Sequence, residues 1–112
     1  MDPEHRQARR LIMRVPMWIR SINRLPQEGQ REQGVESMNI SIRGTYFAAE
    51  GHFQVGEKIR VRLKMPEVIV PGQKTQWCFT GRVTHVDRLG ANGKSGVGVH
   101  FLYYSAGKKP LD

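Results

Sequence analysis

Short stretches of alternating apolar and polar residues follow one another along most of this chain. The clearest is GEKIRVRLKM, residues 56–65, where Ile59, Val61 and Leu63 share one face and basic residues occupy the other. Because side chains two positions apart in a strand point to the same face, this alternation predicts a half-buried β-strand. Five further stretches are rich in the β-branched and aromatic residues that strands favour. The six predicted strands cover residues 15–23, 35–44, 44–50, 56–65, 76–87 and 96–104.

Turn-forming residues separate these strands at fairly even spacing. The connection at 66–73 contains two prolines, and the one at 88–96 contains three glycines and an asparagine. Six short strands with regular turn signals are typical of a closed or nearly closed barrel. The sequence therefore predicts an all-β fold, a six-stranded antiparallel β-barrel. The residues expected in or beside its core are Trp18, Phe47, Ile59, Val61, Leu63, Trp77, Phe79, Val83, Val97, Val99 and Phe101.

The two ends of the chain differ from the predicted barrel. Residues 1–13 are polar and charged without sustained periodicity, so we expect a flexible basic N-terminal arm in the free protein. The barrel is expected to occupy residues 14–104. The final stretch, residues 105–112, is short and rich in helix-breaking residues, and we expect a tail with little or no C-terminal helix.

The charge of the chain points to an anionic partner. Eighteen Lys+Arg against ten Asp+Glu give a net charge of +8, and the pI is about 10.3. Such a balance favours a nucleic acid, a nucleotide, a phospholipid headgroup or an acidic protein as partner. The eight basic residues up to position 43 are all arginines, whose planar fork pairs with phosphate or a guanine edge. A solvated arginine-rich arm would give the same composition.

The sequence also bounds the location of the protein. No apolar run approaches the length of a membrane span, and the N-terminal MDPEHRQARR lacks the apolar core of a secretory signal. Cys78 is the one cysteine, so an internal disulfide and a four-cysteine zinc site are excluded. A cytoplasmic protein without a membrane span is the expectation.

The stretch MNISIRGTYF carries polar side chains that a purely structural strand would not need. Asn39 and Ser41 are two residues apart and are expected on one outward face, with Ile40 and Ile42 on the core face. An amide can bond a base edge, and a hydroxyl can bond a phosphate or sugar. Gly44 is expected to let a ligand approach the backbone closely. Taken alone, the same pattern suits solvent-facing polar residues beside a turn.

Upstream, RQARRLIMRVP places Arg6, Arg10 and Arg14 at intervals of four. A guanidinium can bond the O6 and N7 atoms of guanine, stack on a purine and neutralise a phosphate. Arg10 and Arg14 come directly before the first predicted strand, close enough to fold over an outer face of the barrel. We therefore predict that these arginines and the NISIRG stretch form one site.

Together the two stretches resemble the PilZ domain family, bacterial receptors for the second messenger cyclic di-GMP. RLIMR contains the family's RxxxR run, and NISIRG contains its (N/D)xSxxG run, in the family's order. GRVTHV and GVGVHF are also similar to the family's last strands, so the resemblance covers roughly residues 9–104. It implies that Arg10 and Arg14 clamp guanines and phosphates of cyclic di-GMP. It also implies that Asn39, Ser41 and Gly44 surround the other side of one guanine and its ribose-phosphate.

The resemblance carries two further implications. Arg9 matches a position that influences whether one ligand or a stacked pair is held, whereas Arg6 lies outside the motif and is expected to give electrostatic support only. The protein would be a receptor and adaptor that transmits the second-messenger level to an unidentified downstream protein through ordering of its arm. No cofactor is expected besides the ligand cyclic di-GMP.

Neither a catalytic site nor a metal site is expected. His85 would face inward and His100 outward if Val83 and Val99 both face the core, so the two histidines would not form a metal pair. Cys78 lies between two aromatic residues in a strand and is expected to be a packed thiol. An enzyme is therefore not expected.

Two other functions fit the sequence. One is a PilZ-like protein-interaction adaptor with weak or no nucleotide binding, in which Arg10 and Arg14 would matter only for solubility. The other is a small basic barrel of the OB kind that binds single-stranded nucleic acid. Such proteins stack bases on exposed aromatic side chains. Aromatic residues are only 8% of this chain, so nucleic acid is not the expected partner.

Overall fold

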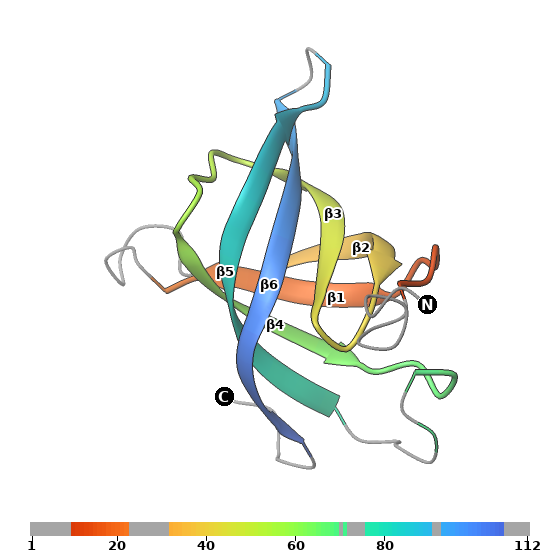
Figure 1. Ribbon diagram of the computed structural model, residues 1–112. Coiled ribbons are helices and arrows are strands. Elements are labelled where there is room, and N and C mark those ends of the chain that lie inside the picture. The colour runs from red at the N-terminus through yellow and green to blue at the C-terminus, as the bar shows by residue number, and fades with distance from the viewer. Residues whose placement is uncertain (1–9, 23–31, 70, 72–75, 91–92, 107–112) are drawn as a thin grey trace, which may run out of the picture.

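The computed structural model describes residues 10–22, 32–69, 71, 76–90 and 93–106 of the chain. They form β1 (Pro16–Ser21), β2 (Gln33–Ile40), β3 (Gly44–Glu50), β4 (Lys58–Lys64), β5 (Gln76–Arg88) and β6 (Lys94–Ala106). The strands close into an antiparallel barrel in the order β1-β2-β3-β6-β5-β4, and no helix occurs among the described residues (Figure 1). The predicted six-stranded all-β barrel is confirmed.

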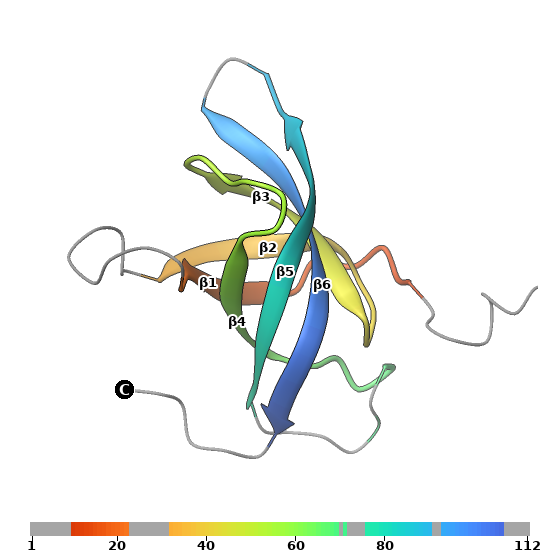
Figure 2. The same ribbon diagram turned by 60° about the vertical axis from the view of Figure 1, so that its left-hand side comes forward.

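Strand β1 closes the barrel because it pairs with β2 along one edge and with β4 along the other. Met17 lies opposite Val35 on β2 and opposite Leu63 on β4, and its side chain is fully buried. Strands β5 and β6 are the longest, with 13 residues each, and their hairpin projects beyond the other strands (Figures 1 and 2).

The core follows the predicted alternation. Ile59, Val61 and Leu63 of β4 have no exposed surface, while the basic residues between them lie on the outside. Phe79 and Phe101 stack inside the barrel with ring centroids 3.9 Å apart. The other predicted core residues that are confirmed as buried are Phe47, Trp77, Val83, Val97 and Val99.

Trp18 is not a core residue, contrary to the prediction. Its neighbours Met17 and Ile19 are buried, so the alternation of β1 directs Trp18 outward, and 37% of its surface is exposed. The Arg62 guanidinium lies 4.9 Å from the centre of its ring in a cation–π contact. The aromatic side chain of Trp18 suggested a core position, but its place in the inward–outward alternation of β1 puts it outside.

The predicted inward orientation of His85 is also wrong. The register between β5 and β6 shifts between Val83 and His85, where a β-bulge adds one residue to β5. The extra residue reverses the alternation, so Val83 stays buried while His85 is exposed, as His100 is. Within the described residues, no group of three or more His, Cys, Asp or Glu residues could hold a metal ion.

The predicted N-terminal arm and C-terminal tail each lie partly within and partly outside the described residues. The barrel strand β6 continues to Ala106, and the paired part of the chain begins at Leu11, which bridges to Ile40. The rest of the predicted arm, residues 1–9, and most of the predicted tail, residues 107–112, lie outside the described residues. The described part of the chain has no helix that could span a membrane.

Candidate functional site

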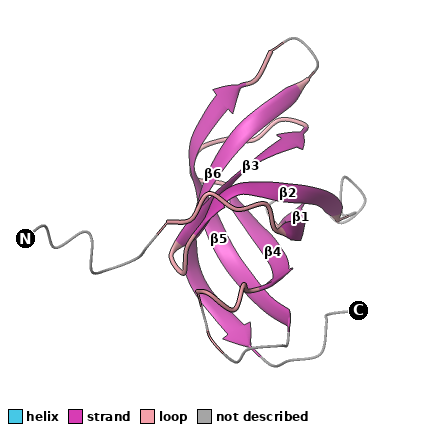
Figure 3. Ribbon diagram, turned by 90° about the vertical axis from the view of Figure 1, so that its right-hand side faces the viewer, coloured by secondary structure: helices cyan, strands magenta, loops and turns pink. Residues whose placement is uncertain are grey.

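The chain segment before β1 is held against the end of β2. Leu11 and Ile40 exchange two backbone hydrogen bonds of 2.9 Å, and the segment crosses the outside of the barrel as a loop (Figure 3). The buried Ser37 hydroxyl donates to the Met13 carbonyl oxygen at 2.5 Å and accepts from the Val15 amide at 2.9 Å. These bonds bring the arginine motif to the strand that carries the second motif.

The second motif is a turn rather than a continuous strand. Strand β2 ends at Ile40, and the Ser41 amide donates to the Gly44 carbonyl oxygen at 2.9 Å. The Ser41 hydroxyl accepts from the Arg43 amide at 3.0 Å and is buried, whereas Ile42 is 39% exposed. The predicted orientations of Ser41 and Ile42 are therefore wrong, because the strand alternation stops before them.

Gly44 is required by the barrel itself. A Cβ atom there would collide with the backbone carbonyl oxygen of Val99 on β6, and Gly44 is buried. The turn is further fixed by the Phe101 amide, which donates to the Arg43 carbonyl oxygen at 2.7 Å. We predicted that a ligand would approach the Gly44 backbone closely. At this face of Gly44 it is strand β6 that does so.

Arg10 and Asn39 are the motif residues that come together. The Arg10 Nη1 donates to the Asn39 Oδ1 at 3.4 Å, a long contact in an exposed position. Asn39 lies opposite Tyr46 of β3 in the strand register, beside the turn. A guanidinium, an amide and an aromatic ring are therefore neighbours on the outer face of the barrel.

Arg14 lies on the same segment but has a different partner. Its Nη1 is 3.7 Å from the Glu36 Oε1, and the two side chains are 83% and 58% exposed. An ion pair of this length and exposure contributes little to stability. Arg14 therefore keeps most of its hydrogen-bonding capacity for another anion. Arg6 and Arg9 lie outside the described residues.

Tyr46 extends the polar face across β3, β6 and β5. Its ring lies over Gly96 and Gly98. A Cβ atom at Gly96 would therefore collide with the Tyr46 hydroxyl. That hydroxyl donates to the Asp87 Oδ2 at 2.8 Å, and the Asp87 Oδ1 is 2.9 Å from the His85 Nε2. Burial and the hydrogen bond to Asp87 raise the pKa of Tyr46, so its hydroxyl remains a donor.

Sequence reasoning missed three residues of this region. Ser37 anchors the arm, Glu36 pairs with Arg14, and Tyr46 borders Asn39. Tyr46 was accessible to prediction, because it lies two residues after Gly44 and so shares its strand face. No local pattern indicates the roles of Glu36 and Ser37, since their partners lie more than twenty residues earlier in the chain.

The comparisons with known proteins agree with this fold. The family model of the PilZ domain matches residues 4–109, nearly the whole chain. The chain belongs to the PilZ domain family.

Among solved structures, this PilZ domain is similar to the Bacillus subtilis inhibitor of motility (MotI/DgrA), with a TM-score of 0.66 and 22% sequence identity. The alignment covers 90% of this chain and 44% of that protein, so the PilZ domain described here spans less than half of its length. At this identity the likeness concerns the fold. Among curated proteins, none matches the sequence.

Proposed function

We propose that this PilZ domain is a receptor for cyclic di-GMP that passes the second-messenger level to a partner protein by binding rather than by catalysis. The observation that supports it is the pairing of Leu11 with Ile40, which brings Arg10 of the first motif within 3.4 Å of Asn39 of the second. Two sequence motifs separated by nearly thirty residues thus share one outer face. A cytoplasmic location follows from the proposal, because the ligand is an intracellular messenger.

The ligand chemistry suits the exposed groups of this face. Cyclic di-GMP offers two guanine edges and two phosphate charges, and the exposed guanidinium groups of Arg10 and Arg14 can donate to both kinds of acceptor. Asn39 supplies an amide beside Arg10, while Ser41 and Gly44 act by shaping the turn on which Asn39 depends. Arg9 is proposed to set whether one ligand or a stacked pair is held.

Ligand binding is proposed to order the arm. The described contacts anchor the chain from Leu11 onward, so the ordering concerns the side chains of Arg10 and Arg14 and the residues before them. A partner protein would then recognise the changed surface. The name of the structural neighbour, an inhibitor of motility, is compatible with such an adaptor role. Hydrogen exchange of the arm amides that is unchanged by ligand would argue against the ordering.

Isothermal titration calorimetry with cyclic di-GMP tests the receptor proposal. We expect saturable binding to the wild-type chain and at least about tenfold weaker binding to Arg14→Ala, because hydrogen bonds to charged groups contribute roughly 1.5–3 kcal/mol. Arg88→Ala is the matched control, since Arg88 is exposed at the far end of β5 and its loss changes the net charge equally.

The other outcomes of this titration separate the alternatives. A folded wild-type chain that releases no heat with cyclic di-GMP at modest salt would replace the receptor by a protein-binding adaptor. Binding of single-stranded DNA or RNA with equal losses in Arg14→Ala and Arg88→Ala would indicate a general nucleic-acid binder, because sequence-independent binding depends on total positive charge.

A further inference from the structure

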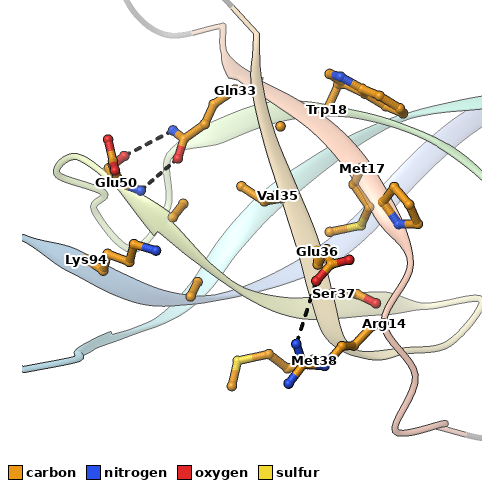
Figure 4. A pocket seen from close by; sticks show the side chains of 14 residues that line it. Arg14, Met17, Trp18, Gln33, Val35, Glu36, Ser37, Met38, Glu50 and Lys94 are labelled. Atoms are coloured by element: carbon orange, nitrogen blue, oxygen red, sulfur yellow. Dashed lines mark hydrogen bonds and ion pairs between the residues drawn. The ribbon is translucent and has the colours of Figure 1, made fainter.

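A groove of about 590 Å³ lies on the side of the barrel next to the arginine motif (Figure 4). We call it the β2–β3 groove. Residues of β1, β2 and β3 line it, together with Arg14 at one end and Lys94 of β6. It is therefore distinct from the Arg10–Asn39 contact but shares Arg14 with the proposed ligand site.

The groove exists because β2 and β3 separate. Their backbone register runs from the Ile40–Thr45 pair to the Ser37–Phe47 pair. Beyond it, the Gln33 side chain bridges the two strands, accepting from the Glu50 amide at 2.8 Å and donating to the Glu50 carbonyl oxygen at 3.1 Å. The Gln33 side-chain amide thus takes the place of a backbone peptide in joining the two strands. The strands are farther apart there, and the hollow lies between the Gln33–Glu50 bonds and Ser37.

The floor of the groove is apolar and partly open to solvent. Met17 and Ala49 are buried beneath it, while Trp18 and Met38 are 37% and 48% exposed. Arg62 packs over the Trp18 ring. Met38 is an unbranched side chain, which can change conformation to fit a bound peptide. An apolar segment laid in the groove would contact the Trp18 and Met38 side chains and remove their exposed surface from water.

The rim couples this floor to the ligand motif. Arg14 and Glu36 form their ion pair at one end of the groove (Figure 4). A guanidinium that moves toward an anionic ligand leaves the Glu36 carboxylate, because a single exposed contact of 3.7 Å holds it there only weakly. The Arg14 end of the groove then changes from a neutral pair to a single negative charge beside an apolar floor.

We propose that the β2–β3 groove docks an apolar segment of a partner protein that carries a lysine or arginine, and that Arg14 occupies Glu36, the acceptor for that cation, until ligand withdraws Arg14. Charge complementarity identifies the occupant, because Glu36 becomes the acceptor for the partner's cation. The inference rests on the proposed receptor function and adds the surface that the partner reads. Glu36 is a competitor of the ligand for Arg14, so it also limits ligand affinity.

The first test is the effect of Glu36 on ligand affinity. We expect Glu36→Gln to bind cyclic di-GMP about two- to fivefold more tightly by calorimetry, the range for loss of an exposed ion pair. Glu50→Gln, at the last residue of β3, is the charge-matched control, and its affinity for cyclic di-GMP should equal that of the wild type. Equal affinities for Glu36→Gln and Glu50→Gln would overturn the competition between Glu36 and the ligand.

The second test uses two blocked pentapeptides, Val-Leu-Lys-Leu-Val and Val-Leu-Glu-Leu-Val, titrated with and without saturating cyclic di-GMP. The lysine peptide should shift the Trp18 indole N–H and the Met38 methyl signals by NMR, with affinity raised about threefold by ligand. The glutamate peptide should not. The indole N–H of the buried Trp77 is the internal control. In Glu36→Gln the preference for lysine should disappear.

These tests separate the two proposals. If cyclic di-GMP binds but the lysine peptide leaves the groove signals unchanged, or binds equally with and without ligand, the docking proposal is wrong and the receptor stands. If cyclic di-GMP does not bind, the receptor proposal fails in the calorimeter, and a ligand-gated groove fails with it.

Discussion

Arg62 on β4 and Arg14 before β1 are both arginines on the outside of the barrel that pair with a glutamate, but the protein uses them in opposite ways. Arg62 donates to both oxygens of Glu32, at 2.6 and 3.1 Å, and to the Gln76 Oε1 at 3.2 Å. Its side chain is 19% exposed and covers the Trp18 ring. Arg14 has one ion-pair contact among the described residues, at 3.7 Å, and is 83% exposed.

The difference separates arginines that serve the fold from arginines that remain available. A guanidinium with its fork filled by a carboxylate has little to offer an incoming anion. A guanidinium with one long contact can change partner at small cost, since exposed ion pairs contribute little. Net charge alone cannot make this distinction. The same contrast applies to the second motif, whose Ser41 and Gly44 are committed to the turn, whereas the Asn39 side chain is held among the described residues by a long contact of 3.4 Å to Arg10.

The largest expected effect on stability concerns Gly44, a motif residue that serves the fold, as Arg62 does. Gly44→Ala should lower the free energy of unfolding by about 2–3 kcal/mol, because the new Cβ would meet the Val99 carbonyl oxygen, a backbone atom that cannot move alone. Urea denaturation measures the loss. Gly34→Ala is the control, because its Cβ would lie 3.7 Å from the Trp18 ring, and equal stability losses in both variants would contradict the argument.

Ser37 should come next. Ser37→Ala removes the donor to Met13 and the acceptor for the Val15 amide, and we expect a loss of about 2 kcal/mol from buried groups left without partners. Hydrogen exchange should accelerate at Leu11 and Val15. Ser95→Ala, which removes one 3.3 Å bond to a carbonyl oxygen, should change neither quantity.

The comparison itself is tested by removing each arginine. Arg62→Ala should destabilise the fold by about 1–2 kcal/mol and leave ligand affinity unchanged. Arg14→Ala should change stability by less than about 0.5 kcal/mol while weakening cyclic di-GMP binding. Denaturation and calorimetry on the same two variants give both readings. A stability loss in Arg14→Ala as large as that in Arg62→Ala would abolish the distinction.

The smallest expected effect depends on pH. The hydrogen bond from Arg62 is the main cause that holds the pKa of Glu32 below its ordinary value of 4.5. A carboxyl with a lowered pKa in the folded state stabilises the fold above its unfolded pKa, and this stabilisation is lost as pH falls through the folded pKa. Denaturation should therefore show a stability decrease below about pH 4.5 that is reduced in Glu32→Gln. An equal decrease in the wild type and in Glu32→Gln would contradict this expectation.

Strand phase explains which parts of the fold could be predicted from the sequence. The β4 alternation was sufficient because seven consecutive residues lie in one regular strand. Prediction failed where regularity ends. One inserted residue after Val83 turned His85 outward, and the turn after Ile40 placed Ser41 inside and Ile42 outside. A bulge and the first residue of a turn have no distinct local pattern in this chain.

The candidate site was predictable in its composition but not in its connections. Arg10, Arg14 and Asn39 could be named from motif spacing, and their ligand roles stay predictions. The contacts that organise them, Leu11 with Ile40 and Ser37 with Met13, join residues far apart in the sequence. Only the folded chain brings these segments together, so neighbouring residues in the sequence do not reveal such contacts.

The Gln33 bridge to Glu50 also bears on self-association. An open strand edge offers unpaired amide and carbonyl groups to the edge of another molecule, which is a route to aggregation. By holding the backbone N–H and C=O of Glu50, the Gln33 amide removes this pair of groups from the part of the wall where β2 and β3 separate. A single glutamine thus leaves β2 and β3 far enough apart for a groove while it occupies one pair of backbone groups that a strand edge of another molecule could bind.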